Sequence, residues 1–224
     1  IPDSVMLAIT TPVGTILHTG DFKIDYTPID GKQMDLGRIA ELGNKGILAL
    51  MSDSTNSERK GFTMSEKSVG AVFDKLFMNC KKRIVVATFA SNVHRVQQIV
   101  DSAVKYGRKI AVCGRSMINM IENARALGYI DAPENIFIDI DLIKNYNDEQ
   151  LVIITTGSQG ETMSALTRMA AGEHKKVTIT PNDLVIISAN AIPGNEKLVS
   201  KVIDDLMKIG AEVVYSALAD VHVS

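Results

Sequence analysis

Two acids and a histidine in this sequence stand where they could do chemistry. Asp21 and Asp53 each follow a short apolar run of the kind that forms a strand, and His222 stands close to the last residue. A carboxylate at the end of a strand is a good metal ligand, but one carboxylate does not hold a metal by itself. These residues therefore indicate part of an enzyme rather than the whole of one.

The acids also have a purely structural interpretation, which the residue types alone leave open. Asp21 could be an Asx-type turn residue, and Asp53, with two hydroxyl residues after it, could cap a turn or a helix. The sequence favours structural roles for two other histidines. His18 lies in an expected strand, and His174 lies in a connection that we expect to be solvated and inert.

A glycine-bearing turn offers a possible phosphate site. It consists of Gly157, Ser158, Gln159, Gly160 and Glu161, between an expected buried strand and a helix start. Such turns present backbone N–H groups and the positive end of the helix to an anion. Alternatively, the glycines only permit a tight strand-to-helix turn. The turn is not a Walker loop, because the lysine and the required spacing are missing.

Three further turns could contact a ligand. Ser91 and Asn92 could cap the helix that carries His94, and this histidine could touch a phosphate or a base, or lie on the surface. Arg115 could bind a phosphate through two N–H groups, or be solvated or ion-paired. Asn195, after a proline and a glycine, is expected to begin a helix and could also contact a ligand.

Composition describes an ordinary globular protein. The 224 residues are 46% apolar and 22% charged, enough for one large domain or for one and a half. The net charge of −2 excludes a global attraction for nucleic acid and leaves only a local patch. No apolar run approaches the roughly 18 residues of a membrane span, and no signal peptide is visible. Cys80 and Cys113 share no metal or redox spacing, so we expect packed, reduced thiols and a cytoplasmic protein.

The pattern of the chain changes near residue 60. Before it, apolar segments at 4–10 and 15–19 flank a Thr-Pro-Val-Gly hairpin signal, residues 47–51 read as a further strand, and residues 26–37 are turn-rich and irregular. After it, strands alternate with amphipathic helices, the first of which begins with a capping box of Thr63 and Glu66. The expected strands are 84–88, 110–113, 135–140, 151–155, 184–188 and 212–215, and the expected helices start near 63 and cover 93–104, 116–127, 162–171 and 195–209.

This alternation predicts an α/β fold with a parallel, doubly wound sheet covered by helices on both faces. Ligands of such sheets bind at the carboxyl ends of the strands. The four polar turns described above all follow expected strands, so we expect them at one edge of the sheet.

Six short segments together resemble bacterial ribonuclease J, a metallo-β-lactamase-fold ribonuclease with an inserted β-CASP domain. They occur in the family's order, and the resemblance covers essentially the whole chain. The segments are Ile-Pro-Asp-Ser at 1–4, His-Thr-Gly-Asp-Phe-Lys at 18–23, Ser-Asp-Ser-Thr-Asn at 52–56, Thr-Gly-Ser-Gln-Gly-Glu at 156–161, Ile-Pro-Gly-Asn-Glu at 192–196 and His-Val-Ser at 222–224.

The resemblance implies a role for several residues. Asp21 matches the aspartate that bridges two zinc ions, Asp53 matches an acid that pairs with a histidine near the scissile phosphate, and His222 matches that histidine. The segment that ends at Ser224 and the strand-end loops would hold RNA phosphates, including a 5′-monophosphate. Two metals that position a hydroxide, and a histidine that protonates the leaving oxygen, make a sensible phosphodiesterase.

The resemblance also implies what the sequence lacks. The family's His-x-His-x-Asp-His motif would lie before Ile1, and its last zinc histidine and C-terminal domain would follow Ser224. We therefore expect an internal piece, with residues 1–63 from the end of the metallo-β-lactamase domain (αββα) and residues 64–224 from the β-CASP domain. The whole enzyme would cleave single-stranded RNA both endonucleolytically and 5′-to-3′, as a homo-oligomer or with a paralogue, whereas the piece alone would be inactive.

Two other classes of function stay open at this point. The chain could be an RNA- or phosphate-binding α/β module without catalysis, using the turns at 157–161 and 192–196. It could also be an unrelated doubly wound nucleotide-binding protein, in which Asp21, Asp53 and His222 have no common task.

Overall fold

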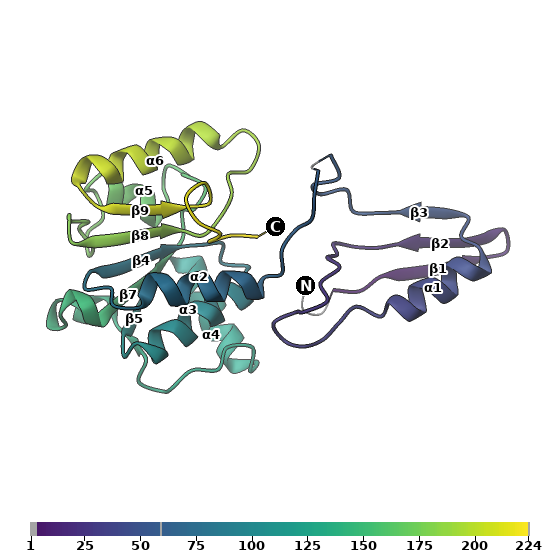
Figure 1. Ribbon diagram of the computed structural model, residues 1–224, viewed down its shortest axis with the longest axis horizontal. Helices are drawn as coiled ribbons and strands as arrows, with labels where there is room; N and C mark the ends of the chain where they lie inside the picture. Colours follow the sequence, from purple (N-terminus) through teal and green to yellow (C-terminus); the bar gives the residue numbers. More distant parts are fainter. Residues whose placement is uncertain (1–3, 59, 224) are drawn as a thin grey trace. The chain divides into compact units, whose positions relative to one another are not determined.

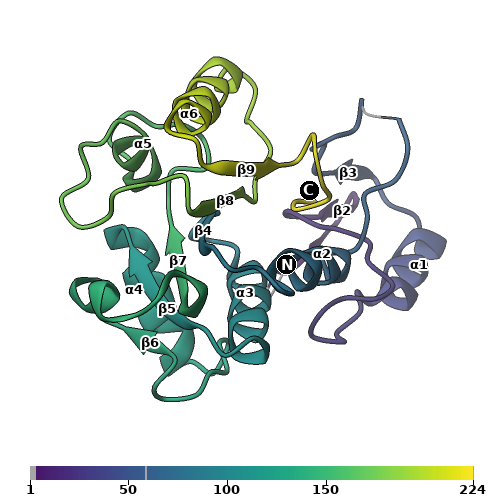
Figure 2. The same ribbon diagram turned by 60° about the vertical axis from the view of Figure 1, so that its left-hand side comes forward.

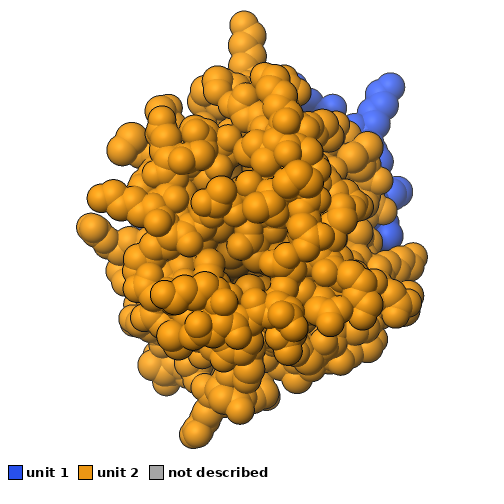
Figure 3. Space-filling model, turned by 90° about the vertical axis from the view of Figure 1, so that its left-hand side faces the viewer, with its two compact units in different colours: residues 1–65 blue, residues 66–224 orange. Residues whose placement is uncertain are grey.

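A computed structural model describes residues 4–58 and 60–223 of the chain. The chain divides into two compact units, residues 1–65 and residues 66–224 (Figure 3). Each unit is described below by itself. The expected assignment of residues 1–63 to the end of a metallo-β-lactamase core stays a prediction.

The smaller unit is built on a three-stranded sheet in the order β1-β2-β3 (Figure 1). The predicted hairpin is confirmed, since β1 and β2 are antiparallel and Thr11 pairs with Gly14 across the turn. The Thr11 hydroxyl also donates to the Gly14 carbonyl at 2.7 Å. β3 adds to β2 in parallel, so β2 and β3 end at the same edge of the sheet. The strands are β1 (Leu7–Thr11), β2 (Gly14–His18) and β3 (Ala49–Met51).

A helix in the smaller unit overturns part of the sequence interpretation. The stretch at 26–37 was expected to be irregular, but α1 (Leu36–Lys45) begins inside it. Asp35 caps this helix, because its carboxylate accepts from the Arg38 N–H at 2.9 Å. No residue of α1 is buried. Leu36, Ile39 and Ala40 do recur at helical spacing, but two glycines within the helix weaken its helix propensity.

The larger unit confirms the predicted α/β fold. Its six strands are all parallel, in the order β6-β5-β7-β4-β8-β9. Its strands are β4 (Arg83–Ala87), β5 (Lys109–Cys113), β6 (Phe137–Ile138), β7 (Leu151–Thr155), β8 (Asp183–Ile187) and β9 (Glu212–Tyr215). Its α-helices are α2 (Lys67–Phe77), α3 (Val93–Lys105), α4 (Arg115–Ala126), α5 (Ala165–Ala170) and α6 (Glu196–Ile209), and two 3₁₀ segments, η1 (Ile140–Asn145) and η2 (Asp148–Gln150), precede β7.

Helices cover both faces of this sheet, as Figure 2 shows. Successive strand residues point to opposite faces. In β4, Ile84 and Val86 pack with α2, α3 and α4, whereas Val85 and Ala87 pack with α5 and α6. Because both faces are buried, the strands are continuous apolar runs, and these runs made the strands readable in the sequence.

Two helix starts differ from the sequence prediction. The capping box is wrong: α2 begins after Glu66, and the Glu66 side chain makes no capping hydrogen bond, because it pairs with Arg95 instead. The helix expected at 162–171 is shorter, since Ser164 caps α5 by accepting from the Thr167 N–H at 3.3 Å. Residues 161–163 therefore belong to the turn that follows β7.

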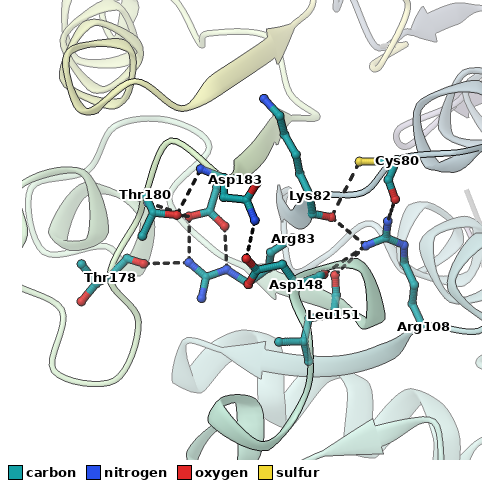
Figure 4. A network of polar contacts seen from close by, with 10 residues as sticks. Cys80, Lys82, Arg83, Arg108, Asp148, Leu151, Thr178, Thr180 and Asp183 are labelled. Carbon is teal, nitrogen blue, oxygen red and sulfur yellow. Dashed lines mark hydrogen bonds and ion pairs between the residues drawn. The ribbon is translucent and has the colours of Figure 1, made fainter.

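Buried charged side chains connect the amino ends of the central strands (Figure 4). The Arg83 Nε donates to Asp183 Oδ1 at 2.6 Å, and its Nη2 donates to Oδ2 at 2.7 Å. This two-bond pair joins the first residues of β4 and β8. Arg108, which is 2% exposed, instead donates to four backbone carbonyls. These are the carbonyls of Cys80, Lys82, Asp148 and Leu151, at 2.5, 3.0, 3.5 and 3.1 Å.

Candidate functional site

The carboxyl ends of four neighbouring strands lie side by side in the larger unit. The last residues of β5 and β7 pair with each other, and Ala87 at the end of β4 pairs with the ends of both β7 and β8. The four polar turns follow these ends, so the prediction that they share one edge is confirmed. This edge is the candidate site of the larger unit.

A buried arginine on α3 joins several elements at this edge. The Arg95 side chain is 0% exposed. Its Nε donates to Glu66 Oε1 and its Nη2 donates to Glu66 Oε2, the latter at 2.7 Å. Gln98 Nε2 also donates to Glu66 Oε1, at 3.3 Å. A carboxylate held by two parallel N–H bonds restrains both side chains, so this pair locks the start of α2 onto α3.

The third nitrogen of the same guanidinium reaches the segment after β9. Arg95 Nη1 donates to the carbonyl and hydroxyl oxygens of Ser188 at 3.1 and 2.5 Å, and to the Val221 carbonyl at 3.0 Å. It also lies 3.3 Å from Nδ1 of His222. The Ser188 hydroxyl donates to the same Val221 carbonyl at 2.5 Å. The segment that carries His222 is therefore anchored on buried polar groups at the end of β8.

The sequence reading missed Arg95, Glu66 and Ser188 as parts of the site, although one signal was present. Arg95, Gln98 and Ser102 recur at helical spacing among the apolar residues of α3, and all three are buried. A charged side chain in the buried register of a helix is rarely accommodated without a partner. The helical spacing of Arg95 among buried residues could thus have indicated that Arg95 is buried and paired. It could not have indicated the partners, which lie far away in the sequence.

The predicted phosphate turn is tightly packed. Gly157 and Gly160 have φ angles of 102° and 71°, and a Cβ on Gly160 would lie 2.6 Å from the backbone of Leu198 in α6. Gln159 is 2% exposed, and its amide bridges to the next loop by donating to the Asn190 carbonyl and accepting from the Ile192 N–H, each at 2.7 Å. Ser158 is also buried. Gln159 thus shapes the edge by joining the turns after β7 and β8.

The other predicted contact residues are more accessible. Ser91, Arg115 and Glu161 are exposed, and His94 and Asn195 are partly buried. Of the two expected caps of α3, the structure gives the role to Asn92, whose side chain accepts from the Arg95 N–H at 3.0 Å. Asn195 does precede α6, but its side chain makes no capping hydrogen bond. Ser224, also predicted to bind RNA, lies outside the described residues, as do residues 1–3. The RNA roles of all these residues stay predictions.

The smaller unit brings the two predicted acids to one edge. Asp21 follows the end of β2 and Asp53 follows the end of β3, which is paired in parallel with β2. The Asp53 N–H donates to the Thr19 hydroxyl at 3.0 Å, which ties the two strand ends together. Asp53 also fits the structural alternative, because its carboxylate accepts from the Thr55 N–H and forms an Asx turn. The hydrogen bond at Asp21 involves its backbone carbonyl, which accepts from the Ser4 hydroxyl at 2.8 Å.

Local hydrogen bonds keep Asp53 ionised. Its Oδ1 accepts from the Thr55 N–H at 2.9 Å and from the Thr55 hydroxyl at 2.8 Å. These bonds, the backbone one first, hold the pKa of the Asp53 carboxyl below its ordinary value of 3.8. Asp53 belongs to the smaller unit and His222 to the larger one, so their pairing stays a prediction.

The ligands around Asp21 are too few for a metal. Among the described residues, no three His, Cys, Asp or Glu side chains gather in a group that could hold a metal ion. A zinc site needs three or four protein ligands. The residues of this chain that the structure describes therefore do not by themselves fit the implied pair of zinc ions.

His174 differs from its expected place in a solvated connection. It is partly buried, and its Nε2 lies 3.3 Å from the Sγ of buried Cys113. Burial lowers the pKa of His174 and raises that of the Cys113 thiol, so both groups favour their neutral forms. The packed, unreactive thiol expected for Cys113 agrees with this.

Comparison with known families gives the assignment. The family described as "Ribonuclease J, beta-CASP domain" matches residues 81–206, which is more than half of the chain. The chain belongs to the ribonuclease J family. The matched residues contain all four strand-end turns of the larger unit. The unrelated nucleotide-binding alternative is thereby wrong.

Relatives named ribonuclease J align with the entire chain. The protein of Helicobacter pylori (strain ATCC 700392 / 26695) is 53% identical over 224 residues, and that of Synechocystis is 51% identical over the same length. The protein of Mycolicibacterium smegmatis is 48% identical. The chain spans only 32% to 40% of the length of these relatives. Within the described residues, no helix is long and apolar enough to cross a membrane.

Proposed function

We propose that this chain is the β-CASP-bearing part of a zinc-dependent ribonuclease that acts in RNA processing and decay. The protein would cleave single-stranded RNA internally and from the 5′ end, with a preference for a 5′-monophosphate, in the cytoplasm and as a homo-oligomer or with a paralogue. The observation that carries this proposal is the ribonuclease J, β-CASP match over residues 81–206. Identity along the whole chain to proteins named ribonuclease J supports it.

Three residues would do the chemistry in this proposal. Asp21 would contribute one oxygen ligand to the metal site, and Asp53 and His222 would form an acid–histidine pair at the scissile phosphate. The Asp53 carboxyl is ionised at neutral pH, since its hydrogen bonds lower its pKa. A histidine that protonates the leaving oxygen would contribute on the order of 10²- to 10⁴-fold to the rate.

The strand-end turns of the larger unit would contact the RNA backbone. Ser91, Glu161 and Asn195 lie on these turns, and His94 and Arg115 lie in the first turns of the helices α3 and α4 that follow. Arg115 is exposed at the first position of α4, where its guanidinium could donate two N–H bonds to a phosphate. Ser158 and Gln159 are buried and would act by shaping the loop, whose backbone N–H groups can bind an anion.

The proposal is tested in the full-length protein by changing His222. We expect His222→Gln to lower kcat by roughly 10² or more on 5′-monophosphorylated RNA and to leave KM nearly unchanged, because a lost proton donor acts on the chemical step. His174→Gln is the matched control, since His174 lies in the same unit and has no role in the proposed chemistry. Comparison with 5′-hydroxyl RNA tests the end preference. Equal activity of His222→Gln and wild type would overturn the role of His222.

The 224-residue polypeptide alone is a different case, because its described residues gather no metal site. We propose that by itself it binds no stable pair of zinc ions and has negligible ribonuclease activity. Metal analysis of the purified polypeptide, together with a turnover assay on 5′-monophosphorylated RNA, tests this. Two tightly bound zinc ions, or measurable turnover, would refute it.

A second candidate function is RNA binding without catalysis by the same polypeptide. It is favoured by the strand-end edge, which lies wholly within the larger unit. Binding through phosphates weakens as salt rises, because RNA contacts release counterions. Titration of single-stranded RNA at two salt concentrations measures this. A lack of salt-sensitive binding would count against this function.

A further inference from the structure

One buried side chain joins the polar turns that follow β7 and β8. Gln159 is 2% exposed, and its amide faces the segment that leads into the second turn. Its Nε2 donates to the Asn190 carbonyl and its Oε1 accepts from the Ile192 N–H, each at 2.7 Å. The orientation of the amide is thereby fixed, because a carbonyl can only accept and an N–H can only donate. Gln159 thus holds both ends of residues 190–192.

Each of these turns is closed by its own backbone, so the amide of Gln159 joins two preformed pieces. The Gly160 N–H donates to the Gly157 carbonyl at 3.1 Å, and the Asn195 N–H donates to the Ile192 carbonyl at 2.9 Å. Within the described part of the chain, Gln159 is the one residue outside the second turn and α6 that hydrogen-bonds to residues 190–194. The polar anchoring of the turn after β8 therefore depends on Gln159.

We propose that Gln159 is a positioning residue that holds the turn after β8 in place to contact RNA beside the turn after β7. This rests on the proposed function, in which Asn195 contacts the RNA. The Asn195 side chain makes no capping hydrogen bond to α6, so it does not have to leave the helix to make that contact. Gln159 is too buried to bind RNA and acts through the turn that ends at Asn195. A turn that is already held in place does not have to be ordered on binding, which favours affinity.

Substitution by methionine separates the two hydrogen bonds from the volume of the side chain. Gln159→Met keeps nearly the same length and removes both bonds. Gln159→Asn is a milder change, because its amide is one methylene shorter and cannot reach both partners. It replaces the methionine variant if that variant does not fold, and the same results are expected of it.

The chain offers a matched control in another side-chain amide that bridges to a backbone. Gln97 Nε2 donates to the Asp131 carbonyl at 2.9 Å, and Gln97 Oε1 accepts from the Asp131 N–H at 2.8 Å. This bridge joins α3 to the loop after α4, which is not one of the strand-end turns. Gln97→Met therefore removes the same kind of link at a place that has no part in the proposed RNA contact.

Hydrogen exchange of the 224-residue chain, followed by NMR, tests the link itself. We expect the Ile192 amide proton to exchange roughly 10-fold faster or more in Gln159→Met than in wild type, because the bond that protects it is lost. Gln97→Met should leave this rate unchanged. Equal exchange of the Ile192 amide in wild type and Gln159→Met would overturn the proposal.

Kinetics of the full-length protein test whether the link serves RNA binding. We expect Gln159→Met to raise KM on 5′-monophosphorylated RNA by roughly 10-fold and to leave kcat nearly unchanged, because contacts with the RNA backbone act equally on the bound substrate and the transition state. Gln97→Met should leave both within about twofold of wild type. A fall in kcat at constant KM, or equal changes in the two variants, would contradict the positioning role.

The two readouts separate this proposal from the proposed function. Wild-type full-length protein that neither bound nor cleaved RNA would overturn the proposed function, and the role of Gln159 toward RNA with it, while the exchange result would still establish the link between the turns. Wild-type protein that cleaved RNA, together with an unchanged KM in Gln159→Met, would overturn the positioning role alone.

Discussion

At the scale of single residues, the larger unit buries two arginines for different purposes. Arg108 donates to backbone carbonyls of two segments, residues 80–82 and 148–151, and its guanidinium lies 6.0 Å from the centre of the Phe77 ring. It therefore satisfies backbone acceptors at the amino ends of the strands. Arg95 has a carboxylate partner and ends on His222 at the carboxyl ends. A buried charge is tolerated only when its donors are satisfied, and the two sites meet that demand in different ways.

The clearest residue-scale prediction concerns Asp53. We expect Thr55→Val to raise the pKa of the Asp53 carboxyl part of the way toward 3.8, because the larger contribution, from the Thr55 N–H, is retained. Since the pKa in the folded protein is depressed, the stability that Asp53 contributes is present above its unfolded pKa and is lost as pH falls through its folded pKa. NMR titration of the Asp53 carboxyl carbon measures the shift.

Thr55→Ser is the matched control for this change, because serine keeps the hydroxyl that donates to Asp53 Oδ1 at 2.8 Å. The serine variant should titrate as the wild type does. An unchanged pKa in the valine variant would show that the hydroxyl bond does not contribute.

At the scale of elements, the turn after β7 is defined by how closely it meets α6. Gly160 and Gly172 have the same φ of 71°, but a Cβ on Gly160 would lie 2.6 Å from the Leu198 backbone, whereas a Cβ on Gly172 would meet nothing within 4 Å. The two glycines therefore share the conformational demand and differ only in packing. Comparing alanine substitutions at the two glycines therefore measures the free-energy cost of the close packing between the turn and α6.

We expect Gly172→Ala to lower the free energy of unfolding by about 1 kcal/mol, the cost of a left-handed residue with a side chain. Gly160→Ala should lose about 1–3 kcal/mol more, because the added methyl must displace backbone atoms. Urea unfolding followed by circular dichroism measures both. Equal losses would show that the turn moves away from α6 without cost.

Much at this scale could be read from the sequence. The strands of the larger unit follow from apolar runs, because a sheet covered on both faces leaves few polar positions, and these lie at the strand ends. The start of α2 could not be read in the same way. Thr63 and Glu66 have the spacing of a capping box, but the Glu66 carboxylate gains more from the guanidinium of Arg95, a residue 29 positions away. α1 has apolar residues at helical spacing, Leu36, Ile39 and Ala40, but Gly37 and Gly43 are weak helix formers and obscure it.

At the scale of the whole molecule, the two units differ in how much core they hold. Among the described residues of the smaller unit, Leu17 is the one buried apolar side chain, whereas the larger unit buries both faces of its sheet. Burial of apolar surface is the main stabilising term in folding. The larger unit therefore buries enough apolar surface to fold by itself. The smaller unit has little buried apolar surface to stabilise it.

We expect a protein of residues 66–224 to fold and to keep the denaturant midpoint of the main unfolding transition of the whole chain. In the whole chain, amide protons of β4, β7 and β8 should exchange slowest, while those of the smaller unit should exchange without global unfolding. Hydrogen exchange measured by mass spectrometry checks this. Failure of residues 66–224 to fold, or equal protection of the two units, would contradict the expectation.

The sequence by itself determined the α/β fold of the larger unit, the alternation of its strands and helices, and the family, because apolar periodicity and short motifs are local properties of the chain. It also placed Asp21, Asp53 and the four turns at strand ends. Only the tertiary structure decided which side chains meet there. The Glu66, Arg95, Ser188 and His222 group joins four separate segments, and Gln159 proved to be a buried link between loops. Such contacts depend on strand order and on helix packing, which no local pattern records.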